Sequence, residues 1–133
     1  MDIDYRTNFG ITTEQFISLL RDSRLAERRP VEDETCMEGM LSNSNLIVTA
    51  WHNDKLIGIA RCLTDFHYAC YLSDLAVAEE YQKAGVGKGL QSALKSRLGN
   101  KCKIILIAAP DADDYYGKIG YQRSPRCWVM QPA

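Results

Sequence analysis

The order of helical and extended patterns along the chain predicts one mixed α/β domain, in which helices cover a central sheet. Two amphipathic helical patterns come first, extended segments follow, and a glycine-rich loop then opens a further helix. The 133 residues, of which 46% are hydrophobic, suffice for one core that buries most apolar side chains. We therefore expect a single domain over residues 1–133, without repeats or an interdomain linker.

Two helices are predicted ahead of the first long strands. The run Thr12-Thr13-Glu14-Gln15 has the pattern of a capping box, and apolar residues follow it at helical spacing. A helix should therefore extend to about Ser23. Pro30 ends the polar, partly helical segment that follows, and a second helix should begin after it. The apolar side of this second helix should consist of Met37, Met40 and Leu41.

Three extended segments come next, at residues 46–51, 55–63 and 68–77. His52-Asn53-Asp54 has the turn chemistry of a tight hairpin between the first two segments. Gly58 lies inside the second segment, where a glycine indicates a bulge or a close backbone approach. The sequence thus predicts a hairpin and a third long strand.

The second half of the chain predicts a helix, a buried strand, a short helix and a last strand. Apolar residues recur at helical spacing over residues 90–98, and Gly99-Asn100 provides the stop. The isoleucine-rich run 103–109 has the pattern of a buried strand. Acidic residues begin a short helix at 111–118, and residues 127–130 should form the last strand.

Charge and cysteine usage limit the classes of function. The net charge of -1 gives no basic footprint for nucleic acid, and no apolar run approaches the ~20 residues of a membrane span. The first residues are too polar for a secretory signal. The five cysteines are odd in number, form no C-x-x-C pair and have mostly apolar neighbours. We therefore expect buried free thiols in a reducing cytoplasm, and no metal site.

The most informative feature is a glycine-rich loop between a strand and a helix. Leu75-Ala76-Val77 ends the strand, and Gln82-Lys83-Ala84-Gly85-Val86-Gly87-Lys88-Gly89 leads into the helix. Glycines at this place allow a tight turn and leave backbone N–H groups at the positive end of the helix dipole, where phosphate binds. Lys83 and Lys88 add positive charge at the rim. The alternative is an ordinary helix-entry turn.

Two other phosphate-binding motifs do not fit this loop. A dinucleotide fingerprint needs a third glycine where the chain has Leu90, and a P-loop needs a glycine where it has Gln82.

Together with a second motif, the loop resembles that of the GNAT superfamily of N-acetyltransferases. The family pattern is Q/R-x-x-G-x-G/A, after a strand that ends in an L-x-V-like sequence. A second family pattern is a tyrosine, three further residues, and then a glycine followed by an aromatic residue. Downstream, the chain has a similar sequence, Tyr116-Gly117-Lys118-Ile119-Gly120-Tyr121. The resemblance covers most of the chain. It implies a mixed, mostly antiparallel central sheet flanked by helices and splayed at its fourth and fifth strands.

The resemblance also implies a reaction. An acetyl group would pass from acetyl-CoA to a primary amine by direct attack, with small amines or amino-acid-like metabolites as acceptors and a protein amine as an alternative. Strand backbone would pair with the pantetheine arm, the loop amides would hold the diphosphate, and a backbone N–H near Ala76 would polarise the thioester. The implied coenzyme-binding residues are Leu75, Ala76, Val77, Gln82, Lys83, Ala84, Gly85, Val86, Gly87, Lys88, Gly89 and Tyr116.

Two catalytic roles follow from the same resemblance. Tyr116 matches the general acid that protonates the leaving thiolate, with the adjacent Tyr115 as the second candidate. Asp74 is the candidate general base, because it lies on the strand beside the expected thioester. The alternatives are a salt-bridged aspartate, and an amine whose pKa is low enough to need no base. Ala109 stands where many relatives have an asparagine that contacts the coenzyme.

Several questions stay open at this point. The acceptor pocket could involve aromatic residues of 66–71 and the acidic residues 33, 34 and 65, although core packing and solvated helix faces are the commoner roles of such residues. One alternative function is a non-catalytic sensor that binds acetyl-CoA. Another is an interaction protein without a ligand, which the intact glycine loop disfavours. Many relatives are dimers, and a homodimer is left open.

Overall fold

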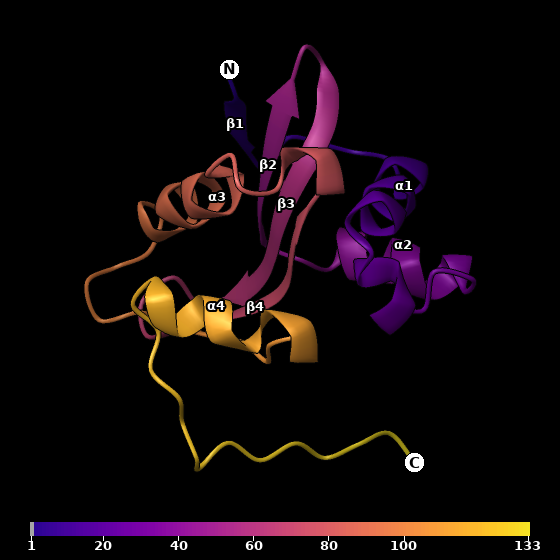
Figure 1. Ribbon diagram of the computed structural model, residues 1–133. Coiled ribbons are helices and arrows are strands. Elements are labelled where there is room, and N and C mark those ends of the chain that lie inside the picture. The colour runs from indigo at the N-terminus through magenta and orange to yellow at the C-terminus, as the bar shows by residue number, and fades with distance from the viewer. Residues whose placement is uncertain (1) are drawn as a thin grey trace.

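A five-stranded sheet forms the centre of the molecule (Figure 1). The structure is a computed structural model that describes residues 2–133. The strands are β1 (Asp4–Thr7), β2 (Leu46–His52), β3 (Lys55–Thr64), β4 (Ala69–Val77) and β5 (Lys103–Ile105). They lie in that order across the sheet; the first four pair antiparallel, and β5 pairs parallel with β4. The mixed, mostly antiparallel sheet is confirmed.

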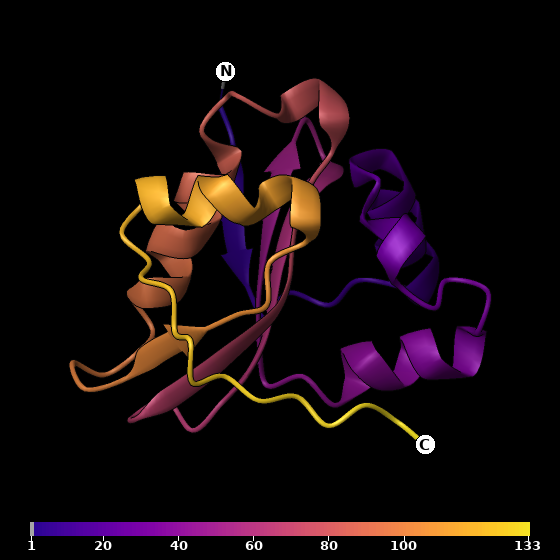
Figure 2. The same ribbon diagram turned by 60° about the horizontal axis from the view of Figure 1, so that its bottom comes forward.

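Helices cover both faces of this sheet. They are α1 (Thr13–Ser23), α2 (Glu34–Ser42), α3 (Val86–Lys95) and α4 (Asp113–Lys118), with 3-10 turns η1 (Leu25–Arg28), η2 (Glu79–Tyr81) and η3 (Pro110–Ala112). α1 and α2 lie on one side of the sheet and α3 lies on the other, with α4 on the α3 side (Figures 1 and 2).

Two apolar clusters join the helices to the sheet. On one face, Val86, Leu90 and Leu94 of α3 pack over buried residues of β2, β3 and β4. On the other face, Phe16 of α1 and Met37 of α2 pack toward the same strands, and both are fully buried. The sheet is thus buried on both faces, and apolar contacts with the sheet hold the helices in place.

The local signals for the first helix and the hairpin are confirmed. Thr12 Oγ1 accepts from the Gln15 N–H at 3.0 Å, and Gln15 Oε1 accepts from the Thr12 N–H at 2.9 Å. In the hairpin turn, Asn53 and Asp54 have φ of 49° and 64°. Two successive residues at positive φ are what a type I′ turn requires, and this turn matches the twist of the strands it joins.

A bulge and a close backbone approach, the two features that a glycine inside a strand indicates, are both present at Gly58. The pairing register of β2 and β3 shifts beside it, between Ala50 and Trp51. A Cβ at position 58 would lie 3.1 Å from Leu90 Cδ1 and 3.2 Å from Val86 Cγ1. Glycine therefore lets the first turns of α3 approach the sheet closely.

Several expectations about element bounds are wrong. β1 was not expected, because its polar sequence lacks the apolar alternation of a half-buried strand. α3 ends at Lys95 and β5 at Ile105, short of the expected 98 and 109.

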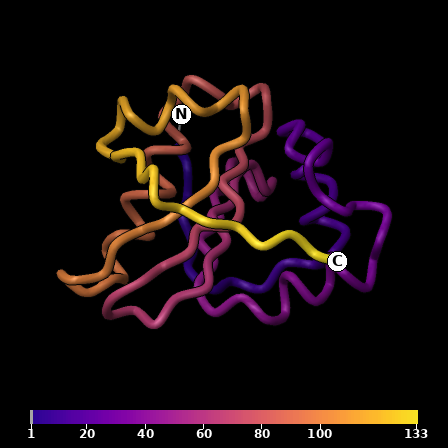
Figure 3. Tube along the Cα trace, turned by 90° about the horizontal axis from the view of Figure 1, so that it is seen from below, coloured from indigo at the N-terminus to yellow at the C-terminus, as the bar shows by residue number. Residues whose placement is uncertain are grey.

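The expected last strand at residues 127–130 does not form. This segment is irregular, and Trp128 and Met130 are 93% and 97% exposed. Apolar residues favour a strand only where a partner strand pairs with them, and here the chain after α4 runs as an extended trace toward the side of α1 and α2 (Figure 3).

Candidate active site

The pairing between β4 and β5 is short, and this opens the sheet. It joins Ala69, Cys70 and Tyr71 to residues 103–105. Residues 72–77 of β4 have no strand partner on that side among the residues that the structure describes. The splay expected at the fourth and fifth strands is therefore present. An unpaired strand edge presents N–H and C=O groups that an extended ligand can meet as a further strand would.

A cleft of about 1200 Å³ lies at this splay. Its walls come from β4, the loop before α3, η1, residues 106–112 and α4. The cleft brings together ten of the residues that the sequence singled out: Leu75, Ala76, Val77, Gln82, Lys83, Gly85, Val86, Gly87, Lys88 and Tyr116. Three others, Asp74, Ala84 and Gly89, do not line it.

The loop at one end of the cleft leaves the N-terminus of α3 uncapped. Lys83 and Gly85 adopt left-handed φ values of 71° and 80°. Gly85 is the N-cap, and no side chain of residues 2–133 makes a capping hydrogen bond there. The N–H groups of the first turn therefore point toward the cleft end without intrahelical partners, at the positive end of the helix dipole. Gln82 Nε2 donates to the Val77 carbonyl at 2.9 Å, which ties the loop to the end of β4.

α4 places two tyrosines in the opposite wall. The Tyr116 ring packs edge-on between Tyr115 and Tyr121, with ring centroids 5.2 and 5.4 Å away. Burial is the main effect that raises the pKa of Tyr116 above its usual 10.0, with a smaller opposing effect from Arg29. Burial likewise raises the pKa of Tyr121 to about 12. Tyr116 therefore stays protonated at neutral pH, as a proton donor in the cleft must.

Asp74, the candidate general base, is not among the residues that line the cleft. Its Oδ1 accepts from Arg29 Nε and its Oδ2 accepts from Arg61 Nε, both at 2.5 Å. The carboxylate is fully buried. Both oxygens accept from arginine side chains, so the structure shows the salt-bridged aspartate that the sequence left as an alternative.

Arg29 is a site residue that the sequence analysis treated only as part of a helix break. It lines the cleft, and its Nη2 donates to the Ser73 carbonyl at 2.8 Å. Arg61 anchors the other side of Asp74, since its guanidinium also donates to Ser44 Oγ and Ser73 Oγ, each at 2.8 Å. No local sequence pattern indicates these contacts, because their partners lie far apart along the chain.

Most residues considered for the acceptor pocket have structural roles instead. Asp65 Oδ1 accepts three backbone N–H groups, which lower the pKa of this carboxyl to about 2. Asp33 caps α2 through the Cys36 N–H. Phe66 packs against the core, and Tyr68 lies outside the cleft with Lys103 Nζ 3.6 Å from its ring centroid. Of this group, only Tyr71 lines the cleft.

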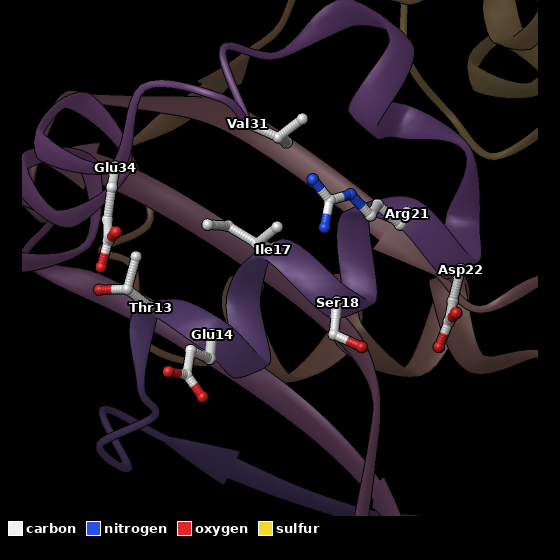
Figure 4. A pocket seen from close by; sticks show the side chains of 8 residues that line it. All are labelled: Thr13, Glu14, Ile17, Ser18, Arg21, Asp22, Val31 and Glu34. Carbon is white, nitrogen blue, oxygen red and sulfur yellow. The ribbon is translucent and has the colours of Figure 1, made fainter.

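A second pocket of about 390 Å³ lies on α1 and the start of α2 (Figure 4). Glu14, Arg21 and Glu34 are among its lining residues, and Arg21 pairs with Glu32 at 3.3 Å. It shares no lining residue with the cleft.

Two further features concern possible metal ligands and membrane-spanning helices within residues 2–133. No group of three or more His, Cys, Asp or Glu side chains is placed to hold a metal ion there. None of the helices in this part has both the length and the apolar composition needed to cross a bilayer. The five cysteines are free; Cys62 and Cys70 are buried as expected, Cys102 is half-buried, and the expectation of burial is wrong for the exposed Cys36 and Cys127.

The cleft thus lies between the splayed edge of β4 and the N-terminus of α3. The family model described as an acetyltransferase (GNAT) domain matches residues 21–127. The chain therefore belongs to the GNAT family of acetyltransferases.

Curated relatives agree with this assignment. An uncharacterized ycf52-like N-acetyltransferase of Prochlorococcus marinus is 32% identical over 105 residues, which cover 74% of this chain and 57% of the relative. The chloroplastic GCN5-related N-acetyltransferase 2 of Arabidopsis thaliana is 34% identical over 76 residues, 53% of this chain and 28% of that protein. The chain thus spans about half the length, or less, of the curated relatives it matches.

Solved structures share the fold. A probable acetyltransferase of meticillin-resistant Staphylococcus aureus superposes with a TM-score of 0.75 at 23% identity, over 98% of this chain and 99% of that chain. An aminoglycoside N-acetyltransferase, solved with a bisubstrate analog of coenzyme A and an acetylneamine, gives 0.75 at 18% identity, over 100% and 99% of the two chains. Identities this low support the fold and not the acceptor.

Proposed function

We propose that this protein transfers an acetyl group from acetyl-CoA to a primary amine. The observation that carries the proposal is the continuity between the unpaired edge of β4 and the uncapped N-terminus of α3 within one cleft. An extended amide-bearing arm that ends in a diphosphate fits this arrangement, because the edge can pair with amides and the helix end can hold the anion.

The donor site in this proposal has two parts. Backbone groups of Leu75, Ala76 and Val77 meet the pantetheine arm, although the Val77 carbonyl already accepts from Gln82. The amides around Gly85 and Gly87 hold the diphosphate, with positive charge from Lys83 and Lys88 at the rim. Ala84 and Gly89 shape the turn rather than touch the ligand.

The proposed reaction has two steps: the amine attacks the thioester, and the coenzyme A thiolate then departs. The neutral amine nitrogen forms a bond to the thioester carbonyl carbon, and a backbone N–H near Ala76 stabilises the oxyanion. The carbon–sulfur bond then breaks, and Tyr116 gives its phenolic proton to the departing thiolate. Burial keeps that proton on Tyr116 at neutral pH. The surplus proton on the attacking nitrogen passes to the Tyr116 phenolate, directly or through water, so Tyr116 ends the cycle protonated.

Asp74 has a different role in this proposal from the one expected. It holds Arg29 and Arg61 in place and thereby positions the η1 wall of the cleft against β4. No base is assigned, and the acceptor amine enters in its neutral form. A small-molecule amine is the proposed acceptor, and residence in the cytoplasm stays a prediction from cysteine usage.

Two measurements test this function in sequence. Calorimetric titration with acetyl-CoA establishes whether the donor binds, and release of free thiol with a panel of amines establishes turnover. Binding without turnover on any amine would instead support the sensor function. Absence of binding by the folded wild-type protein would remove both.

A further inference from the structure

The adjacent tyrosines of α4 reach different ends of the cleft. Tyr116 lies where the charge of Arg29 acts on it, near the middle of β4. Tyr115 extends to the first turn of α3: a Cβ added at Gly87 would lie only 2.9 Å from its Oη. One phenol therefore lies at the proposed thioester end and the other at the proposed diphosphate end.

Gln91 fixes the orientation of the Tyr115 hydroxyl. Its side chain is on α3, one turn after Gly87, and the residue is only 9% exposed. Gln91 Nε2 donates to the Gly87 carbonyl at 3.2 Å and to Tyr115 Oη at 3.4 Å. The reversed amide would set two oxygens against each other at Gly87, so this orientation is the favourable one. Because Oη accepts from Gln91, its own hydrogen is left for another acceptor.

The Gln91 side chain also carries a polar atom without a hydrogen-bond partner. Gln91 Oε1 is buried and has no hydrogen-bond partner among residues 2–133. Buried polar atoms without partners are uncommon and usually mark a place where a ligand or water completes the network. This one lies on the side chain that contacts both Tyr115 and the loop end of the cleft.

We propose that Tyr115 is a further ligand of the donor, whose hydroxyl, oriented by Gln91, donates a hydrogen bond to the diphosphate at the N-terminus of α3. This inference rests on the proposed function, since it takes the donor to be acetyl-CoA. The phenol adds a contact from α4 to those of the loop amides, so the diphosphate is held from both walls. Burial raises the pKa of Tyr115, which keeps the group a neutral donor toward an anion.

The inference also gives Gly87 a second reason to be glycine. Any side chain at this position would collide with Tyr115 Oη, while the next tyrosine atom, Cζ, is 3.8 Å away. A merely packed tyrosine would produce the same collision. The tests must therefore separate a hydrogen bond to the ligand from contact with the helix.

The first test compares Tyr115→Phe with Tyr68→Phe, a matched change at a 63% exposed tyrosine outside the cleft. We expect Tyr115→Phe to weaken coenzyme A binding about tenfold in calorimetry, the size of one lost hydrogen bond to a charged group, and Tyr68→Phe to leave it unchanged. Dephospho-coenzyme A retains the diphosphate and should show the same loss. Equal affinity of Tyr115→Phe and wild type would overturn the inference, as would a loss confined to coenzyme A.

The second test uses Gly87→Ala alone and combined with Tyr115→Phe, with thermal melts to verify folding. The inference predicts that the double variant binds coenzyme A no better than Tyr115→Phe. Recovery of wild-type affinity in the double variant would show that Tyr115 only contacts the helix. In steady state, Tyr115→Phe should raise KM for acetyl-CoA with kcat nearly unchanged. Failure of wild type to bind coenzyme A would overturn the proposed function itself, an outcome separate from these.

Discussion

Arg29 Nε donates to Asp74 Oδ1 at 2.5 Å, across 45 residues of sequence. This contact joins the end of η1 to the middle of β4, and the Arg29 Nη2 bond to the Ser73 carbonyl reinforces it. Arg29 lines the cleft, and both oxygens of the buried Asp74 carboxylate accept from arginines. This arrangement does not suit Asp74 as a general base. The pair therefore holds the η1 wall of the cleft against β4, and in the proposed function it takes no part in proton transfer.

Asp74→Asn should destabilise the fold strongly. It leaves the guanidinium groups of Arg29 and Arg61 without their counter-charge, and breaking such buried pairs costs about 3–5 kcal/mol. Urea denaturation measures this loss, and Glu32→Gln in the exposed pair with Arg21 is the control that should change stability little. A stable Asp74→Asn protein with an altered pH profile of kcat would instead restore the role of base.

Tyr116→Phe should lower kcat by at least about a hundredfold and leave the affinity for acetyl-CoA nearly unchanged, because it removes only a proton donor. The protonated phenol is the active form and burial raises its pKa above 10.0, so wild-type activity should fall with rising pH only above that value. The pH profile of kcat checks this. If kcat of Tyr116→Phe still falls at alkaline pH, a group other than Tyr116 is the general acid.

Gly58→Ala should weaken both the fold and the donor site. The added Cβ would lie 3.1–3.2 Å from Leu90, Val86 and Ala50, so α3 must shift. Such overpacking costs about 1–3 kcal/mol and would displace the uncapped helix end as well. Gly10→Ala, where nothing lies within 4 Å, is the matched control. Melting temperature and coenzyme A affinity should fall together. A lower melting temperature with unchanged affinity would show that Gly58 does not influence the donor site.

Asp65 should make the fold acid-sensitive. Three backbone N–H groups lower its folded pKa from 3.8 to about 2. The unfolded chain then binds a proton first, so this contribution to stability is present above the unfolded pKa and is lost as the pH falls toward 2. Asp65→Asn keeps an acceptor oxygen but does not titrate. Urea midpoints measured from pH 5 to about pH 2 should therefore decline less in the variant, and identical declines would contradict the assignment.

The sequence predicted those features that depend on neighbouring residues. The Thr12–Gln15 capping box, the Asn53-Asp54 turn and the glycine loop are local patterns, and each appears as expected. The splay of β4 from β5 followed from the resemblance to a family and not from the spacing of residues.

Features that depend on distant partners were missed. The sequence left a salt-bridged Asp74 open but could not name its partners, because the two arginines are 45 and 13 residues away. Residues 127–130 have strand-forming side chains but no partner strand, and β1 pairs with β2 despite a polar sequence. The motif ranked Tyr116 ahead of Tyr115 as the acid, but only the structure shows that Tyr115 reaches the first turn of α3.

In the proposed function, the N-terminus of α3 holds the diphosphate of acetyl-CoA. Calorimetric titration of acetyl-CoA into wild type, Gly87→Glu and the charge-matched control Gly10→Glu tests it most directly, with melts to verify folding. The account predicts micromolar binding by wild type and the control, and none by Gly87→Glu, whose side chain adds bulk and negative charge where the phosphates would lie. No binding by folded wild type, or unchanged binding by Gly87→Glu, would contradict it.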